Sequence, residues 1–153
     1  MPTRTTTDDL DIAEAVEARA RFVAHNEALL VELTSLPKNH QVANASTGGA
    51  VTTVDALRRQ LTDEPARFRA GLANASTADR AGLDRLKADR ARLITEEAER
   101  RSQVAELGPN VASDDRVLID QWARLRHMLV NLNADIGATE TSIRRTRALL
   151  KGS

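Results

Sequence analysis

The chain has 153 residues, which suits one domain or one extended helical assembly, and 41% of them are hydrophobic. Its 22 basic and 22 acidic residues leave no net charge. This balance disfavours a general nucleic-acid or membrane-surface binder, because such proteins usually carry a net basic field. The chain has no cysteine, so disulfides and thiolate metal sites are excluded.

Targeting signals are also missing from the sequence. No apolar run approaches the roughly 20 residues that a membrane-spanning helix needs. Residues 1–7 lack the apolar segment of a secretory signal and are expected to form a disordered tail. We therefore expect a protein that acts in the cytoplasm or as part of an assembled particle.

Residues 8–36 are predicted to form the first helix, which begins after Thr7 as a capping residue and ends before Pro37. Its buried side is expected to hold Leu10, Ala13, Val16, Ala20, Val23, Leu30 and Leu33. Residues 37–52 mix Pro, Gly, Asn, Ser and Thr without helical periodicity, which predicts a flexible loop. A role for that loop in binding stays open, and His40 is the residue within it that could act as a ligand.

Residues 53–75 are predicted to be either one kinked helix or two short helices, because Pro65 falls inside the segment. Asp63 and Glu64 before this proline would suit the first turn of a new helix. Leu57, Leu61, Phe68 and Leu72 nevertheless stay in phase across it, and this favours a kink.

Residues 76–153 are predicted to form an antiparallel helical hairpin. Ser76, with Asp79 three residues later, resembles a capping box that would open a helix running to Leu107. Gly108-Pro109 is a strong stop signal, and Ser113 would cap the last helix. Because the connection is so short, the two helices should be antiparallel neighbours.

The last helix carries the clearest pattern in the sequence, large residues at alternating steps of four and three. We call these positions the C-terminal stripe: Leu118, Trp122, Leu125, Leu129, Leu132, Ile136, Thr139, Ile143, Thr146 and Leu150. Such a repeat keeps one side of a helix facing a partner helix. The preceding helix has a weaker stripe at Leu83, Leu86, Arg90, Leu93, Glu97, Arg100, Val104 and Leu107.

These elements predict an all-α fold, an elongated helical bundle with a C-terminal antiparallel coiled-coil hairpin. No catalytic or cofactor-binding pattern accompanies them. None of the three histidines follows the Glu-x-x-His spacing of metal-binding bundles, and no phosphate-binding glycine motif occurs. We therefore expect no enzyme activity, no metal, no cofactor and no small-molecule substrate.

The leading expectation is a structural or assembly protein that acts through helix–helix contacts, self-associates, and could form part of a large particle such as a virion. The expected interface residues are the apolar members of the C-terminal stripe: Leu118, Trp122, Leu125, Leu129, Leu132, Ile136, Ile143 and Leu150. For Trp122 the favoured interpretation is an anchor of the chain's own core, and an interface contact is the alternative. The basic end of the last helix (Arg144, Arg145, Arg147, Lys151) complements the helix dipole, so nucleic-acid binding there is disfavoured.

The alternative expectation is a regulatory module whose hairpin tip, carrying Asp114 and Asp115, binds a larger enzyme. Residues 76–81, Ser-Thr-Ala-Asp-Arg-Ala, resemble the tip of one family of factors that insert a coiled-coil hairpin into the secondary channel of RNA polymerase. They lack the first aspartate of that tip and its neighbouring zinc-binding cysteines. The resemblance implies an acidic tip that contacts the enzyme.

Overall fold

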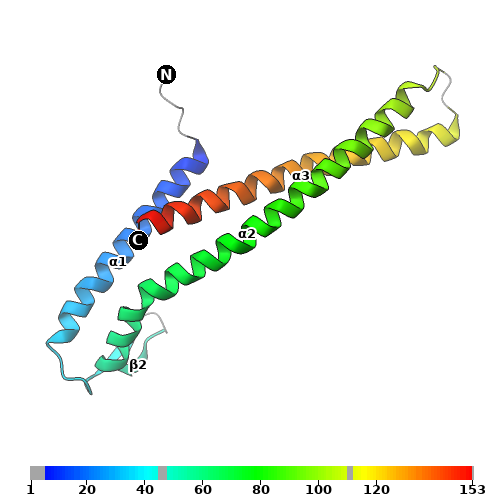
Figure 1. The fold of residues 1–153 in the computed structure, drawn as a ribbon. Coiled ribbons are helices and arrows are strands. Elements are labelled where there is room, and N and C mark those ends of the chain that lie inside the picture. Colours follow the sequence, from blue (N-terminus) through cyan, green and yellow to red (C-terminus); the bar gives the residue numbers. More distant parts are fainter. Residues whose placement is uncertain (1–5, 45–47, 110–111, 153) are drawn as a thin grey trace, which may run out of the picture. The chain divides into compact units, whose positions relative to one another are not determined.

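The computed structural model describes residues 6–44, 48–109 and 112–152, without the side chains of Asn44 and Asp114. Within these residues it contains three helices and two short strands (Figure 1). In chain order they are α1 (Thr7–Thr34), β1 (Gln41–Asn44), β2 (Ala50–Thr53), α2 (Val54–Ala105) and α3 (Ser113–Gly152). The predicted all-α class is confirmed. The chain divides into two compact units: unit 1 comprises residues 1–76 and 144–153, and unit 2 comprises residues 77–143.

Helix α1 begins one residue earlier than the sequence predicted. The backbone N–H of Asp9 donates to Thr6 Oγ1 at 3.2 Å, and the Thr6 N–H donates to Asp9 Oδ2 at 3.2 Å. Thr6 is therefore the capping residue, and Thr7 is already helical. The physical reason is the capping box, which requires a carboxylate three residues after the cap. Asp9 supplies it for Thr6, whereas Thr7 would be followed by Leu10.

The buried side of α1 also differs from the prediction. Leu10, Ala13 and Ala20 are exposed, and the side that packs includes Arg19. Its shielded positions at alternating three- and four-residue steps are Asp9, Ile12, Val16, Arg19, Val23, Asn26, Leu30 and Leu33. An arginine can occupy such a position because a carboxylate from another helix compensates its charge.

Residues 41–44 and 50–53 pair as two antiparallel strands, within a segment that was predicted to be a flexible loop. Gln41 pairs with Thr53, and Asn44 pairs with Ala50. Gly48 and Gly49 adopt φ angles of 72° and 88°, which a residue without a β-carbon adopts at little cost. The glycines that suggested a loop therefore lie directly before β2, in a conformation that residues with a side chain rarely adopt.

The core of unit 1 is small and lies where α1, the β-hairpin and the start of α2 meet. Leu33, Val54 and Leu57 are buried, and Leu29, Val42 and Leu61 pack against them. A backbone hydrogen bond joins the residue before β1 to the first residue of α2, since the N–H of Val54 donates to the carbonyl of His40 at 2.9 Å.

Helix α2 runs without a break from Val54 to Ala105, so the predicted helix start at Ser76 is wrong. Asp79, which would complete the capping box, instead accepts a hydrogen bond from Ser142 Oγ on α3 at 2.8 Å. A carboxylate with this tertiary partner leaves the backbone free to continue as a helix. The chain therefore holds one long helix where two segments were expected.

Pro65 lies inside α2, so the segment is one helix that contains the proline rather than two short helices. Proline has no N–H to donate to the carbonyl four residues earlier, which weakens the helix locally. The Arg67 guanidinium donates to the nearby carbonyl of Gln60 at 3.3 Å. The ribbon of α2 bends near its N-terminal end (Figure 1).

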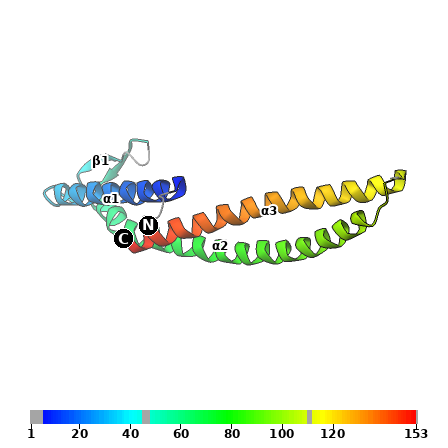
Figure 2. The same ribbon diagram turned by 90° about the horizontal axis from the view of Figure 1, so that it is seen from above.

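Unit 2 is the antiparallel helical hairpin that the sequence predicted. The second part of α2 and the first part of α3 lie side by side in both views (Figures 1 and 2). Three side-chain hydrogen bonds fix their register: Ser142 Oγ to Asp79 Oδ2 at 2.8 Å, Arg90 Nη1 to Asn133 Oδ1 at 3.3 Å, and Trp122 Nε1 to Glu97 Oε1 at 3.0 Å.

The last turns of α3 belong to unit 1, where they meet the first half of α1. The Arg144 guanidinium lies 3.3 Å from the carboxylate of Asp9. A β-carbon at Gly152 would lie 3.5 Å from Val16. The last turns of α3 therefore lie against α1 within unit 1.

Candidate interaction surfaces

The C-terminal stripe faces a neighbouring helix, but most of it is only half covered. Every member from Leu118 to Leu150 is buried or half-buried, and Ile136, Ile143 and Thr146 are the buried ones. Within unit 2 the other buried apolar residue is Leu93 of α2. Two helices bury only the inner edges of their stripes, so the tip-ward members, from Leu118 to Leu132, keep part of their surface exposed.

The matching stripe on α2 is half-covered in the same way and carries charge in its middle. Glu97 accepts the hydrogen bond of Trp122 Nε1, and the Arg101 guanidinium lies 3.9 Å from it. Arg126 stacks over the indole ring at 4.3 Å from the ring centroid. Trp122 is thus anchored inside the hairpin by a polar cluster.

One side of the hairpin carries exposed apolar residues from both helices. Ile94 follows Arg90 by one turn on α2, and Val130 precedes Asn133 by nearly one turn on α3. Because Arg90 and Asn133 touch across antiparallel helices, Ile94 and Val130 lie one turn further along the same side. Their exposed fractions are 51% and 66%. We call this pair the flank patch.

Asp115, at the tip of the helical hairpin, helps to cap the start of α3. Its carboxylate accepts a hydrogen bond from the N–H of Ala112 at 3.0 Å, and its own N–H donates to the Ala112 carbonyl at 3.0 Å. The capping position is thus Ala112, one residue before the predicted Ser113, since α3 begins at Ser113. The predicted tip contact at Asp114 falls on a side chain outside the described part of the structure.

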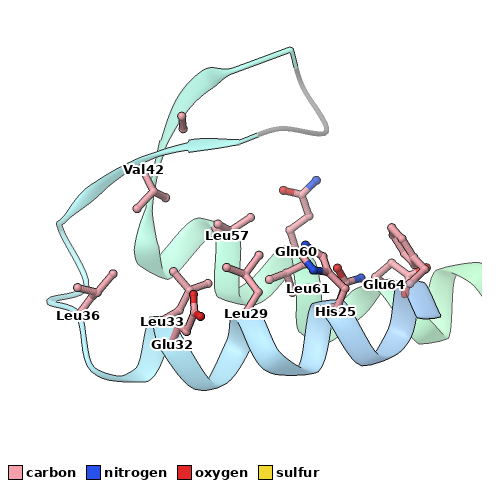
Figure 3. A pocket seen from close by; sticks show the side chains of 13 residues that line it. His25, Leu29, Glu32, Leu33, Leu36, Val42, Leu57, Gln60, Leu61 and Glu64 are labelled. Carbon is pink, nitrogen blue, oxygen red and sulfur yellow. The ribbon is translucent and has the colours of Figure 1, made fainter. Parts of the chain in front are cut away.

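Unit 1 contains an apolar cleft that the sequence did not predict. It has a volume of about 780 Å³ and lies between α1, β1 and the start of α2 (Figure 3). The labelled side chains of Leu29 and Leu33 on α1, and of Leu36 just beyond its end, point up towards Val42 of β1, with Leu57 and Leu61 of α2 behind. Glu32 and Glu64 are the charged side chains among its lining residues, beside His25, Asn26 and Gln60.

A part-buried ion pair lies beside this cleft. Arg19 donates two hydrogen bonds to the carboxylate of Glu64, at 2.5 and 2.9 Å, and the two side chains are only 11% and 25% exposed. The guanidinium carbon lies 3.6 Å from the centroid of the Phe68 ring and 5.4 Å from that of Phe22. Arg19 Nε is buried and has no hydrogen-bond partner in the described structure. We call this group the arginine clamp.

The clamp and the cleft could have been recognised only partly from sequence. The spacing of Leu57, Leu61 and Phe68 indicated one packed side of α2. Arg19 is one of two arginines on α1, and its position gave no sign of burial, because its carboxylate partner is 45 residues away. The aromatic pair Phe22 and Phe68 was visible, but nothing in sequence connected it to Arg19.

The described residues show no group of three His, Asp or Glu side chains that could hold a metal ion. His25 lies at the edge of the cleft. No helix in the part of the chain that the structure describes is both long and apolar enough to cross a membrane. Comparison with protein-family models, curated proteins and solved structures finds no match.

Proposed function

We propose that this protein is a non-enzymatic structural or assembly protein that acts through helix–helix contacts and associates with further copies of itself, as a subunit of a larger particle. The observation that carries the proposal is the half-covered seam of unit 2. There, large apolar side chains repeat at helical spacing along two helices, and among the described residues of that unit only Leu93, Ile136 and Ile143 are buried apolar side chains.

The flank patch supports association on one side of that seam. A two-helix hairpin leaves both of its sides open, and helical bundles bury such stripes by adding helices. Ile94 and Val130 come from different helices, so a second hairpin docking there would meet apolar residues from both. Val117 and Met128 are also exposed, at 59% and 49%, but both belong to α3. Met128 and Val130 are two residues apart and so point to roughly opposite sides of α3.

Light scattering coupled to size-exclusion chromatography tests the proposal on the full chain over a wide concentration range. The wild type is expected to associate, and the double variant Ile94→Lys/Val130→Lys is expected to be monomeric with an unchanged circular dichroism spectrum. The matched control is Val117→Lys/Met128→Lys, which introduces the same charge and should still associate.

A monomeric wild type at the highest concentration would contradict self-association. Loss of association in the control pair, with retention in the Ile94/Val130 pair, would contradict the choice of side. Equal helicity in all variants is required, because unfolding would also abolish association.

A further inference from the structure

Two helices border the cleft of unit 1 with residues at coiled-coil spacing. On α1, positions at steps of four, three and four line it: Phe22, Asn26, Leu29 and Leu33, and Leu36 follows just beyond the end of the helix. On α2, Leu57, Leu61 and Glu64 follow at steps of four and three. Two such rows with a groove between them form the kind of surface into which an amphipathic helix inserts its apolar side.

The residues at the base of the cleft are buried, whereas large apolar residues at its rim are partly exposed. Leu33 and Leu57 at its base are 3% and 6% exposed, so they already belong to the core. Phe22 and Leu36 are 48% and 36% exposed, although both are large apolar side chains. A volume of about 780 Å³ admits the side chains of one helix face, while the backbone of that helix would remain outside.

The charge and polarity of the lining restrict what can enter. The charged lining residues are the carboxylates Glu32 and Glu64, with no lysine or arginine among them. Arg19 neutralises Glu64, whereas Glu32 has no ion pair in the described structure. An anionic ligand would therefore meet uncompensated negative charge at the Glu32 end. An acyl chain would also bury Asn26 without offering it a hydrogen bond, at a free-energy cost that a helix with one polar side chain avoids.

We propose that this cleft binds an amphipathic α-helix of a partner protein, with apolar residues at three- and four-residue spacing and a lysine or arginine that meets Glu32. This inference rests on the proposed function, action through helix–helix contacts, and names the class of partner for unit 1. It places this partner on a surface other than the flank patch.

Two synthetic peptides of about three heptads test the proposal by fluorescence anisotropy. Both carry leucine at the heptad core positions, and their flanking positions are lysine in one peptide and glutamate in the other. The lysine peptide should bind the full chain about tenfold more tightly than the glutamate peptide, since oppositely charged flanks are selected and like charges are repelled. Glu32→Lys should reverse this preference, and Leu36→Lys should abolish binding of both peptides.

The control is Val31→Lys, which introduces the same charge on α1 at a side chain that is 71% exposed and does not line the cleft. It should leave the peptide preference unchanged. An unchanged preference in Glu32→Lys, or equal weakening by Val31→Lys and Leu36→Lys, would overturn the proposal.

A second measurement uses the absence of cysteine from the chain. Ala43→Cys places a single thiol at the cleft for labelling with a polarity-sensitive dye. The lysine peptide should shift the emission to shorter wavelength, and dodecanoate should not. A shift with dodecanoate alone would overturn the helix in favour of an acyl chain. Light scattering on the unlabelled chain tests self-association separately, so failure there leaves the result for the cleft intact.

Discussion

Substitution Glu64→Gln in the arginine clamp should destabilise the protein by about 2–3 kcal/mol. Removing one partner of a fully buried ion pair costs about 3–5 kcal/mol, because the other charge is left uncompensated. Glu64 is 25% exposed, so water can partly replace it and the cost falls below that range. The remaining Arg19 is 11% exposed and already has an unpaired Nε, which keeps the cost substantial.

Substitution of the other partner, Arg19, should lower the free energy of unfolding by less. Arg19→Met keeps the apolar stem and leaves a carboxylate that water can reach, so about 1–2 kcal/mol is expected, including about 1 kcal/mol for the cation–π contact with Phe68. In the double variant Arg19→Met/Glu64→Gln the two costs should not add. The coupling energy from the double-mutant cycle should be about 1.5–2 kcal/mol, because both single substitutions break the same interaction.

Urea unfolding followed by circular dichroism measures these free energies. The control cycle is Arg92 with Glu96, an ion pair at 3.5 Å whose side chains are 63% and 45% exposed. That surface pair should show a coupling energy of about 0.5 kcal/mol or less. A coupling energy for Arg19 and Glu64 no larger than that of the control pair would refute the idea that burial strengthens the clamp.

Four further sets of substitutions test individual contacts of the structure. Ile136→Ala should lower the free energy of unfolding by about 2–4 kcal/mol, because the side chain is only 3% exposed. Val130→Ala should lower it by less than about 0.5 kcal/mol, because that side chain is 66% exposed. Similar urea midpoints for the two variants would contradict the packing of unit 2. Trp122→Phe removes the indole N–H and should lower the unfolding free energy by about 1 kcal/mol, with no change meaning that this hydrogen bond is unimportant. Asp115→Ala should lower the melting temperature through loss of the cap while association stays intact, and loss of partner binding at unchanged stability would favour the tip as a contact site. The pKa of Asp9 is lowered below 3.8 by hydrogen bonds with the side chain and the backbone of Thr6 and by the nearby Arg144. The stabilising contribution of Asp9 is therefore present above pH 3.8 and is lost as the pH falls through its lower folded-state pKa. Asp9→Asn should therefore be less stable than wild type at neutral pH and converge with it in acid, as followed by thermal unfolding.

The hairpin of unit 2 could be predicted because its determinants are local. The C-terminal stripe repeats over the whole of α3, and Gly108-Pro109 ends the preceding helix. Antiparallel pairing follows from the short connection alone. The long-range hydrogen bonds, such as that between Trp122 and Glu97, could not be predicted from residue spacing. Spacing shows which side of a helix packs, but it does not show which residue of the other helix a charged side chain such as Glu97 contacts.

The errors arose where one local signal allows two outcomes. Ser76 with Asp79 has the spacing of a capping box, but the helix continues through both residues and Asp79 accepts a hydrogen bond from Ser142 instead. Gly48-Gly49 marks either a loop or a hairpin turn, and the β-branched residues around it, such as Val42 and Val51, are too few to decide. The cleft escaped prediction for a different reason, since it exists only when α1 and α2 are placed together.

Unit 1 is assembled from segments far apart in the sequence, residues 1–76 and 144–153, with all of unit 2 between them. During synthesis, α1 must wait for the whole hairpin to leave the ribosome before the last turns of α3 can reach it. At about 5–20 residues per second, the 110 residues from Thr34 to Arg144 take about 6–22 s, during which the side of α1 that meets Arg144 and Gly152 is uncovered. Unit 2 can therefore be complete before the last turns of α3 reach α1 in unit 1.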